Sequence, residues 1–130
     1  MTPTQTPEQL RRTALIMWLV FLSTVGMFAF LLKQGLASGG LPPAPDMGLA
    51  PIFTGLAVMM GVGSLILRKV FPVPDTQKWF VRNVICWVMN ESISLLGFVL
   101  GQQQHDFNVA IPYFATTVAF TLFMFPKLPD

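Results

Sequence analysis

Charged residues are scarce in this chain. Lys, Arg, Asp and Glu make up 11% of its 130 residues, whereas a soluble globular domain carries about 25%. Hydrophobic residues make up 53% of the chain, and its mean hydropathy is +0.62. A chain this short has too little interior to bury so much apolar surface away from water. The composition therefore indicates a single domain that is embedded in the lipid bilayer.

Cysteine and histidine are nearly absent too. Cys86 is the only cysteine, so an intrachain disulfide bond is excluded. The single histidine, His105, has only Asp106 beside it, and we expect a solvated loop there rather than a metal site. The net charge of +2 and the lack of a basic patch interleaved with aromatic residues argue against nucleic-acid binding. With no catalytic triad, phosphate-binding loop or haem-ligand pair, we predict no enzymatic activity, no metal and no cofactor.

Four apolar segments have about the 20 residues that a helix needs to cross the hydrocarbon core. We expect one transmembrane domain over residues 1–130, with a short N-terminal tail at 1–12 and spans at about 13–36, 49–67, 78–101 and 109–125. The first span is longer than the apolar region of a cleaved signal peptide, so it is expected to be retained. Prolines in LASGGLPPAPDMG and VFPVPDTQ mark the first two connections. Runs such as ALIMWLVFL do not alternate in polarity, which excludes a membrane β-barrel and predicts an all-α polytopic fold.

The basic residues predict the orientation of the four spans. Four spans place all but one of them on the same side of the membrane: Arg11, Arg12, Arg68, Lys69, Lys78, Arg82 and Lys127. Only Lys33 falls on the other side. Because cytoplasmic loops are enriched in Lys and Arg, we expect both termini in the cytoplasm.

Glu91 lies near the centre of the third expected span. A charged side chain there costs about 2.5–3.5 kcal/mol on insertion scales, and burial disfavours its ionised form. No Lys, Arg or His falls at the same depth. The neutral polar residues expected at mid-depth form one layer with it: Asn90, Ser94, Ser23, Thr24, Thr116 and Thr117. Two interpretations stay open, namely polar groups that hold the bundle together and a binding site for a proton or small cation.

Small residues predict where helices approach closely. Asn83, Asn90 and Ser94 share one face of the third span with Gly97 and Gly101. The second span carries its own small residues: Gly55, Ala57, Gly61 and Gly63. Such residues let helix backbones meet in lipid.

The two halves of the chain show a possible internal sequence repeat. An offset of 71 residues pairs Arg11 with Arg82, Ser23 with Ser94, and Gly26 with Gly97. The second and fourth spans each open on Pro-x-Phe, at residues 51–53 and 112–114. These matches suggest two parallel hairpins related by an axis along the membrane normal.

The segment from the second span to NESISLLGFVLG resembles the hairpin of the ATP synthase proteolipid, subunit c. It has glycines at positions 55, 61 and 63, a basic connection RKVFPVPDTQK, and an acid before LLGFVLG. The resemblance covers about 50 residues of the chain and implies that Glu91 is an ion-binding carboxylate. The glycine series is sparser than in that family, the loop lacks its Arg-Gln-Pro type signature, and two further spans surround the hairpin. The whole chain, with Phe125-Pro126 after its last span, also resembles small four-span bacterial membrane proteins of unknown function.

These observations favour a non-enzymatic subunit of an oligomeric assembly in the bacterial inner membrane. Its expected partners are the lipid bilayer and either further copies of itself or other membrane subunits. The alternative is a component of a proton- or cation-translocating channel or transporter that uses Glu91 as its ion-binding site.

Overall fold

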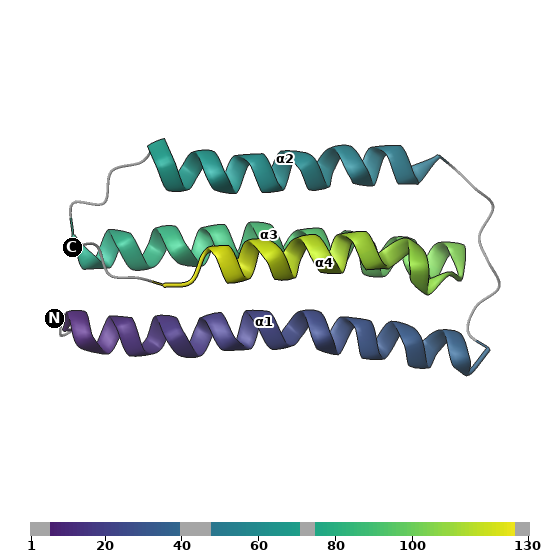
Figure 1. Cartoon of the computed structure of the whole chain (residues 1–130), viewed down its shortest axis with the longest axis horizontal. Helices are drawn as coiled ribbons and strands as arrows, with labels where there is room; N and C mark the ends of the chain where they lie inside the picture. The colour runs from purple at the N-terminus through teal and green to yellow at the C-terminus, as the bar shows by residue number, and fades with distance from the viewer. Residues whose placement is uncertain (1–5, 40–47, 71–74, 127–130) are drawn as a thin grey trace, which may run out of the picture.

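The described part of the chain folds into four helices. The computed structural model describes residues 6–39, 48–70 and 75–126, which form α1 (Pro7–Ala37), α2 (Leu49–Val70), α3 (Thr76–Gln104) and α4 (Phe107–Phe123). Consecutive helices run in opposite directions (Figure 1). The prediction of an all-α fold with four helices is confirmed. The proline-rich connections at 40–47 and 71–74, and Lys127, lie outside the described residues.

Three of the helices are long and apolar enough to cross a membrane, namely α1, α2 and α3. The fourth, α4, has 17 residues, which correspond to about 25 Å of helix. This length is at the lower limit for a helix that crosses a membrane, and α4 is the shortest of the four helices.

Local capping explains where the helices begin and end. α1 starts at Pro7, ahead of the span expected from residue 13, because the side chains of Thr6 and Gln9 form a capping box. α3 starts after Asp75, whose carboxylate accepts a 2.8 Å hydrogen bond from the backbone N–H of Lys78. It ends at His105, which has a left-handed φ of 53°. The residues expected to form a solvated loop are therefore a tight turn, and Asp106 caps the start of α4.

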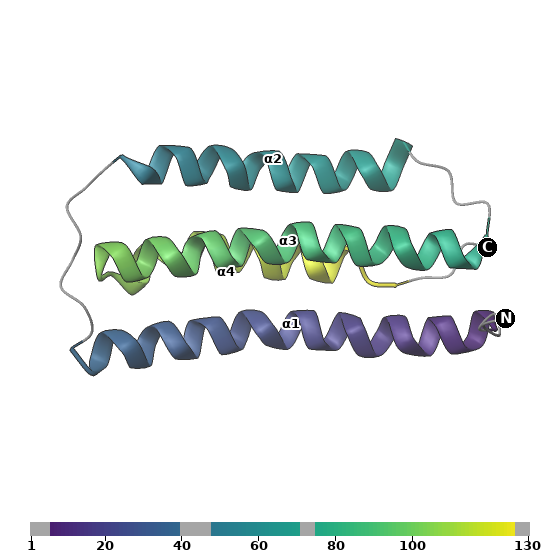
Figure 2. The same ribbon diagram turned by 180° about the vertical axis from the view of Figure 1, so that it is seen from behind.

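α3 is the central helix of the bundle. It packs against α1, α2 and α4, and α1 also packs against α4. The two views place α1 and α2 on opposite sides of the α3–α4 hairpin (Figures 1 and 2). Ten residues of α3 are buried but only two of α2, Gly61 and Ser64. α2 is therefore the most peripheral helix.

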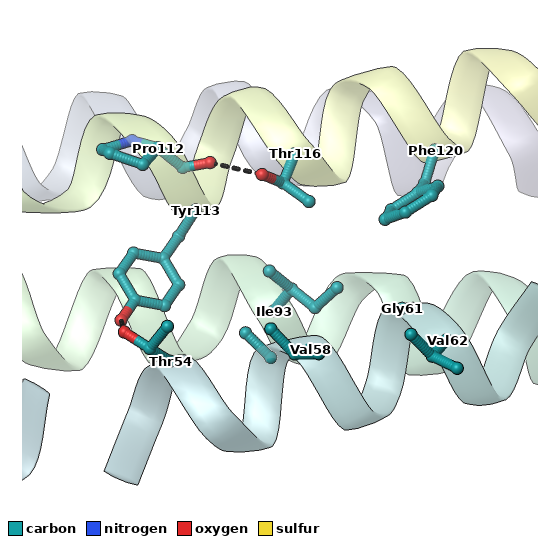
Figure 3. A pocket seen from close by; sticks show the side chains of 10 residues that line it. Thr54, Val58, Gly61, Val62, Ile93, Pro112, Tyr113, Thr116 and Phe120 are labelled. Atoms are coloured by element: carbon teal, nitrogen blue, oxygen red, sulfur yellow. Dashed lines mark hydrogen bonds between the residues drawn. The ribbon is translucent and has the colours of Figure 1, made fainter. Parts of the chain in front are cut away.

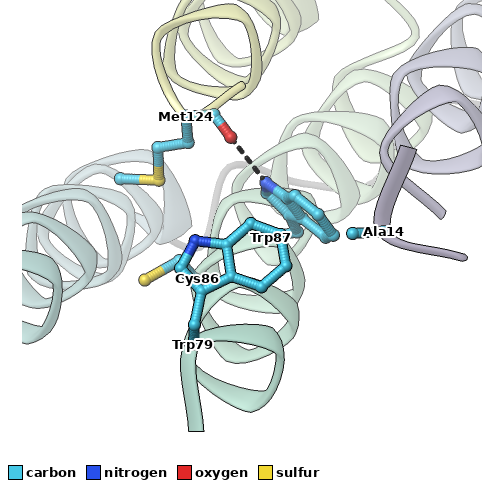
Figure 4. Close-up of a cluster of buried hydrophobic side chains, with 5 residues drawn as sticks. All are labelled: Ala14, Trp79, Cys86, Trp87 and Met124. Atoms are coloured by element: carbon cyan, nitrogen blue, oxygen red, sulfur yellow. Dashed lines mark hydrogen bonds between the residues drawn. The ribbon is translucent and has the colours of Figure 1, made fainter. Parts of the chain in front are cut away.

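The buried apolar side chains form two clusters along α3. The first contains Ala14, Trp79, Cys86, Trp87 and Met124, which Figure 4 labels. The second contains Val25, Leu32, Ala110 and Phe114, toward the other end of the bundle. Asn90, Ser94 and Thr117 are also fully buried.

Glycines lie at several contacts between the helices. A Cβ added at Gly97 would collide with the Cβ of Tyr113, and one at Gly101 would lie 2.7 Å from a methyl group of Leu32. A Cβ at Gly61 would lie 3.0 Å from the ring of Phe120. Gly55, in contrast, has no neighbouring atom within 4 Å of such a Cβ. A Cβ at Gly63 would lie 2.9 Å from the terminal methyl group of Met89. The close helix contacts are therefore made at residues 61, 63, 97 and 101.

The residues paired by the proposed internal repeat have different surroundings. Ser23 is exposed, whereas Ser94 is fully buried. A Cβ added at Gly26 would have no neighbouring atom within 4 Å, whereas one added at Gly97 would collide with Tyr113. The environments of the two halves therefore differ at these positions.

The outer surface of the bundle is apolar. Every helix exposes large hydrophobic side chains, and Met59, Val70 and Phe123 are 67–69% exposed. The described basic residues lie at the end of the bundle where α1 and α3 begin and α2 ends (Figure 1), with Lys33 as the exception near the end of α1. This distribution gives the bundle an apolar middle and one basic end.

Candidate functional site

Asn90 is the centre of a buried polar network between three helices. Its side-chain Oδ1 accepts a 3.2 Å hydrogen bond from the hydroxyl group of Ser64 on α2. Its Nδ2 donates to the sulfur of Met124, which follows α4, at 3.2 Å. The hydroxyl group of Thr117 on α4 donates to the backbone carbonyl of Asn90 at 3.0 Å. Asn90 thus connects α3 to α2 and to α4.

The other hydroxyl groups of the predicted layer bond within their own helices. Each donates to a carbonyl three or four residues earlier, at 2.7–2.8 Å: Ser23 to Leu19, Thr24 to Val20, Ser94 to Glu91 and Thr116 to Pro112. Ser94 therefore bonds to the backbone of Glu91 and not to its carboxylate. Of the predicted polar layer, the structure joins Asn90 and Thr117 through a hydrogen bond between helices.

Two members of this network were absent from the sequence-based prediction. Ser64 is the only serine of α2, and its position three residues after Gly61 is the signal that could have identified it. Its hydroxyl group also donates to the Gly61 carbonyl at 2.8 Å. Met124 carries no such signal, because methionine is an apolar residue in a sequence pattern and this one lies just beyond the end of α4.

Glu91 occupies a different face of α3 from Asn90. It lies on one stripe with Trp87 and Phe98, because residues four and seven apart share a helix face. The ring of Trp87 lies 6.1 Å from that of Phe21, and the ring of Phe98 lies 5.5 Å from that of Phe28. Both partners belong to α1. The stripe that carries Glu91 thus turns toward α1, between two aromatic pairs.

The carboxylate of Glu91 is buried without a partner. Both of its oxygen atoms are inaccessible to solvent, and neither has a hydrogen bond within the described part of the chain. The nearest basic residue along α3 is Arg82, nine residues or about 13 Å of helix away. An ionised carboxylate in such surroundings is costly, since no donor or cation compensates it.

A pocket lies between α2 and α4, on the side of the bundle away from α1. Its volume is about 490 Å³, and α3 contributes only Ile93 to its wall. Figure 3 shows the hydroxyl groups of Thr54 and Tyr113 meeting at one end, at 3.0 Å. Beyond them the walls are apolar, with Val58 and Phe120 on opposite sides. Ala57 and Thr116, both singled out from the sequence, also line this pocket.

The acidic, histidine and cysteine side chains do not gather into a metal site. Within residues 6–39, 48–70 and 75–126, no three His, Cys, Asp or Glu side chains come close enough to hold a metal ion. Cys86 is buried, with its thiol 3.5 Å from the Ser64 carbonyl.

Comparison of the chain with protein-family models, with curated proteins and with solved structures finds no match. The functional argument therefore depends on the geometry of this chain.

Proposed function

We propose that the chain is a non-enzymatic integral membrane subunit of an oligomeric assembly in the bacterial inner membrane. Its apolar outer surface supports the membrane location, because large exposed hydrophobic residues surround all four helices. The basic residues at one end of the bundle support a cytoplasmic position for that end.

The peripheral position of α2 supports assembly. Only Gly61 and Ser64 of this helix are buried, and its exposed side carries Ile52, Met59 and Ile66. A helix with so little contact inside its own subunit has most of its surface free for neighbouring helices.

The observation on which the functional proposal depends is the unpartnered, buried carboxylate of Glu91. We infer that this group is protonated in the resting protein, because neutralisation removes the cost of an isolated charge in hydrocarbon. A glutamine would provide similar polarity without that cost. A carboxyl group at this position therefore favours a second candidate function, reversible binding of a proton or cation during translocation. The resemblance of the α2–α3 hairpin to the ATP synthase proteolipid supports the same role for Glu91.

Membrane insertion is tested by extraction of membranes with alkaline carbonate. An integral protein stays in the pellet, whereas a peripheral one is released. Release of the folded chain would refute the membrane proposal. Native mass spectrometry of the detergent-extracted particle then measures assembly, and a strict monomer would refute the subunit proposal.

The Glu91→Gln variant separates the two functions. Infrared spectroscopy should show a protonated carboxyl band near neutral pH in the parent protein and its loss in this variant. Ser92→Ala is a matched control, because Ser92 is the next residue and its hydroxyl group bonds to the Val88 carbonyl of its own helix. If vesicles containing the parent protein conduct protons or cations, the flux should disappear in Glu91→Gln and persist in Ser92→Ala. Flux that persists in both variants would exclude translocation through Glu91.

A further inference from the structure

Two arginines meet at the basic end of the bundle. Arg68 lies in the last turn of α2, and Arg82 lies in the second turn of α3. Nη1 of Arg82 donates a 3.1 Å hydrogen bond to the backbone carbonyl of Arg68. This bond brings the side chain of Arg82 to the end of α2 and concentrates positive charge there.

The positive charge of Arg68 has no compensating carboxylate in the described residues. Its guanidinium carbon lies 5.8 Å from the ring centroid of Phe123, so the group sits over an aromatic face. Its Nη1 is buried and lacks a hydrogen-bond acceptor within the described ranges. A guanidinium group in this state favours binding of an anion, and phosphate matches its donor geometry.

The pocket between α2 and α4 leads toward this arginine. On α2, the pocket residues Thr54, Val58 and Gly61 recur at spacings of four and three, and Arg68 continues the same stripe. On α4, the pocket residues Thr116 and Phe120 are likewise followed by Phe123. Arg68 and Phe123 contact each other beyond the pocket, about two turns past Gly61 on α2 and one turn past Phe120 on α4. We call the pocket together with this contact the groove.

We propose that this groove binds one anionic phospholipid, with its phosphate at Arg68 and Arg82 and an acyl chain in the α2–α4 pocket. The proposal rests on the membrane location argued above. Charge complementarity selects the head group, because two arginines lie at the groove's end. The apolar walls favour a lipid over a free phosphate ion, because a free phosphate would contact the arginines and leave the apolar pocket empty.

The dimensions of the groove match one leaflet. Half of a hydrocarbon core about 30 Å thick is about 15 Å, or about ten residues of helix. Ten residues before Arg68 is Val58, in the middle of the pocket wall. An acyl chain that starts at the interface beside Arg68 therefore reaches the pocket and ends near mid-membrane.

The test measures lipid binding to the intact protein by native mass spectrometry in mild detergent. Phosphatidylglycerol is the probe, and phosphatidylcholine and inorganic phosphate are the comparison ligands. Arg68→Gln removes the charge at the head-group site, and Lys69→Gln is its control, because Lys69 is the exposed neighbouring cation. Val58→Phe fills the pocket, and Met59→Phe is its control, because Met59 is 69% exposed and does not line the pocket.

The expected result is one tightly bound phosphatidylglycerol. Its affinity should fall by about tenfold or more in Arg68→Gln, since a charge-assisted hydrogen bond is lost. It should also fall in Val58→Phe and stay unchanged in both control variants. Equal losses in Arg68→Gln and Lys69→Gln would overturn the proposal in favour of general surface attraction. Binding of inorganic phosphate with the same affinity, or a change of subunit number in Val58→Phe without loss of lipid, would overturn it as well.

Failure of this proposal is distinguishable from failure of the proposed function. A chain that remains in carbonate-extracted membranes but binds no phosphatidylglycerol retains its membrane location and lacks the lipid site. A chain released by carbonate lacks both.

Discussion

The indole Nε1 of Trp87 donates a 3.0 Å hydrogen bond to the backbone carbonyl of Met124, at the C-terminal end of α4 (Figure 4). Trp18 donates in the same way to the carbonyl of Thr121, at 2.6 Å. The last carbonyls of a helix have no partner inside the helix, and in hydrocarbon they have no water either. Two tryptophans from α3 and α1 therefore supply donors to the short α4 and fix its end in the bundle.

Replacement of Trp87 by phenylalanine keeps an aromatic ring and removes the N–H donor. We expect Trp87→Phe to lower the free energy of unfolding by about 1–3 kcal/mol, because it leaves the buried Met124 carbonyl without this donor. Unfolding in a denaturing detergent provides the measurement. Val88→Ala serves as control, because Val88 is the next residue and 49% exposed. Equal stability of the two variants would show that the hydrogen bond contributes nothing.

Gly97 and Gly55 form a matched pair for the helix contacts. A Cβ at Gly97 collides with Tyr113, so Gly97→Ala should separate α3 from α4 and cost about 1–3 kcal/mol. Gly55→Ala meets no atom within 4 Å and should be neutral or slightly stabilising, because alanine favours the helix. The same unfolding assay compares them. A destabilised Gly55→Ala beside an unaffected Gly97→Ala would contradict the described packing.

Thr116 and Thr117 are neighbours with different hydrogen bonds. Thr117→Val removes the donor to the Asn90 carbonyl on α3 and should cost about 0.5–1.5 kcal/mol. Thr116→Val removes a bond within α4 at an exposed position and should change stability little. Thermal unfolding in detergent, followed by circular dichroism, measures the difference. Identical unfolding curves for both variants and the parent would exclude a stabilising role for the link between Thr117 and Asn90.

The basic end of the bundle predicts which residues face the cytoplasm. With Cys86 replaced by serine, a single cysteine at position 8 should react with an impermeant maleimide only from the cytoplasmic side. A cysteine at position 102, at the opposite end of α3, should react only from the other side. In the parent protein, Cys86 is 1% exposed and should stay unlabelled until the fold is denatured. The reverse pattern for positions 8 and 102 would invert the topology.

Segment length and composition were sufficient to predict four helices, because apolar runs bounded by prolines and charges are unambiguous. The side of each helix that faces the core was harder to predict from the sequence. α1 and α2 carry large apolar side chains on their exposed sides, so hydrophobicity does not mark which side faces the core. Ser23 and Thr116, which were expected in the polar layer, are exposed and bond within their own helices. The presence of each helix was thus predictable, whereas the partner of each hydroxyl group required the structure.

Glu91 illustrates the same difference at the candidate site. Its isolation from basic residues was predicted from spacing alone, and within the described residues neither oxygen of its carboxylate has a hydrogen-bond partner. Its separation from Asn90 was not predicted, because adjacent residues of a helix point about 100° apart. Asn90 faces α2 and α4, whereas Glu91 shares the stripe that turns toward α1.

The central position of α3 has a consequence for biosynthesis. In the described residues, α1 packs against α3 and α4, and α2 packs chiefly against α3. A nascent chain that has been synthesised only as far as Val70 therefore holds two helices whose main partner has not yet left the ribosome. If the chain inserts into a membrane as proposed, both helices stay in the lipid or in the insertion machinery until α3 arrives, and packing against α3 completes the bundle.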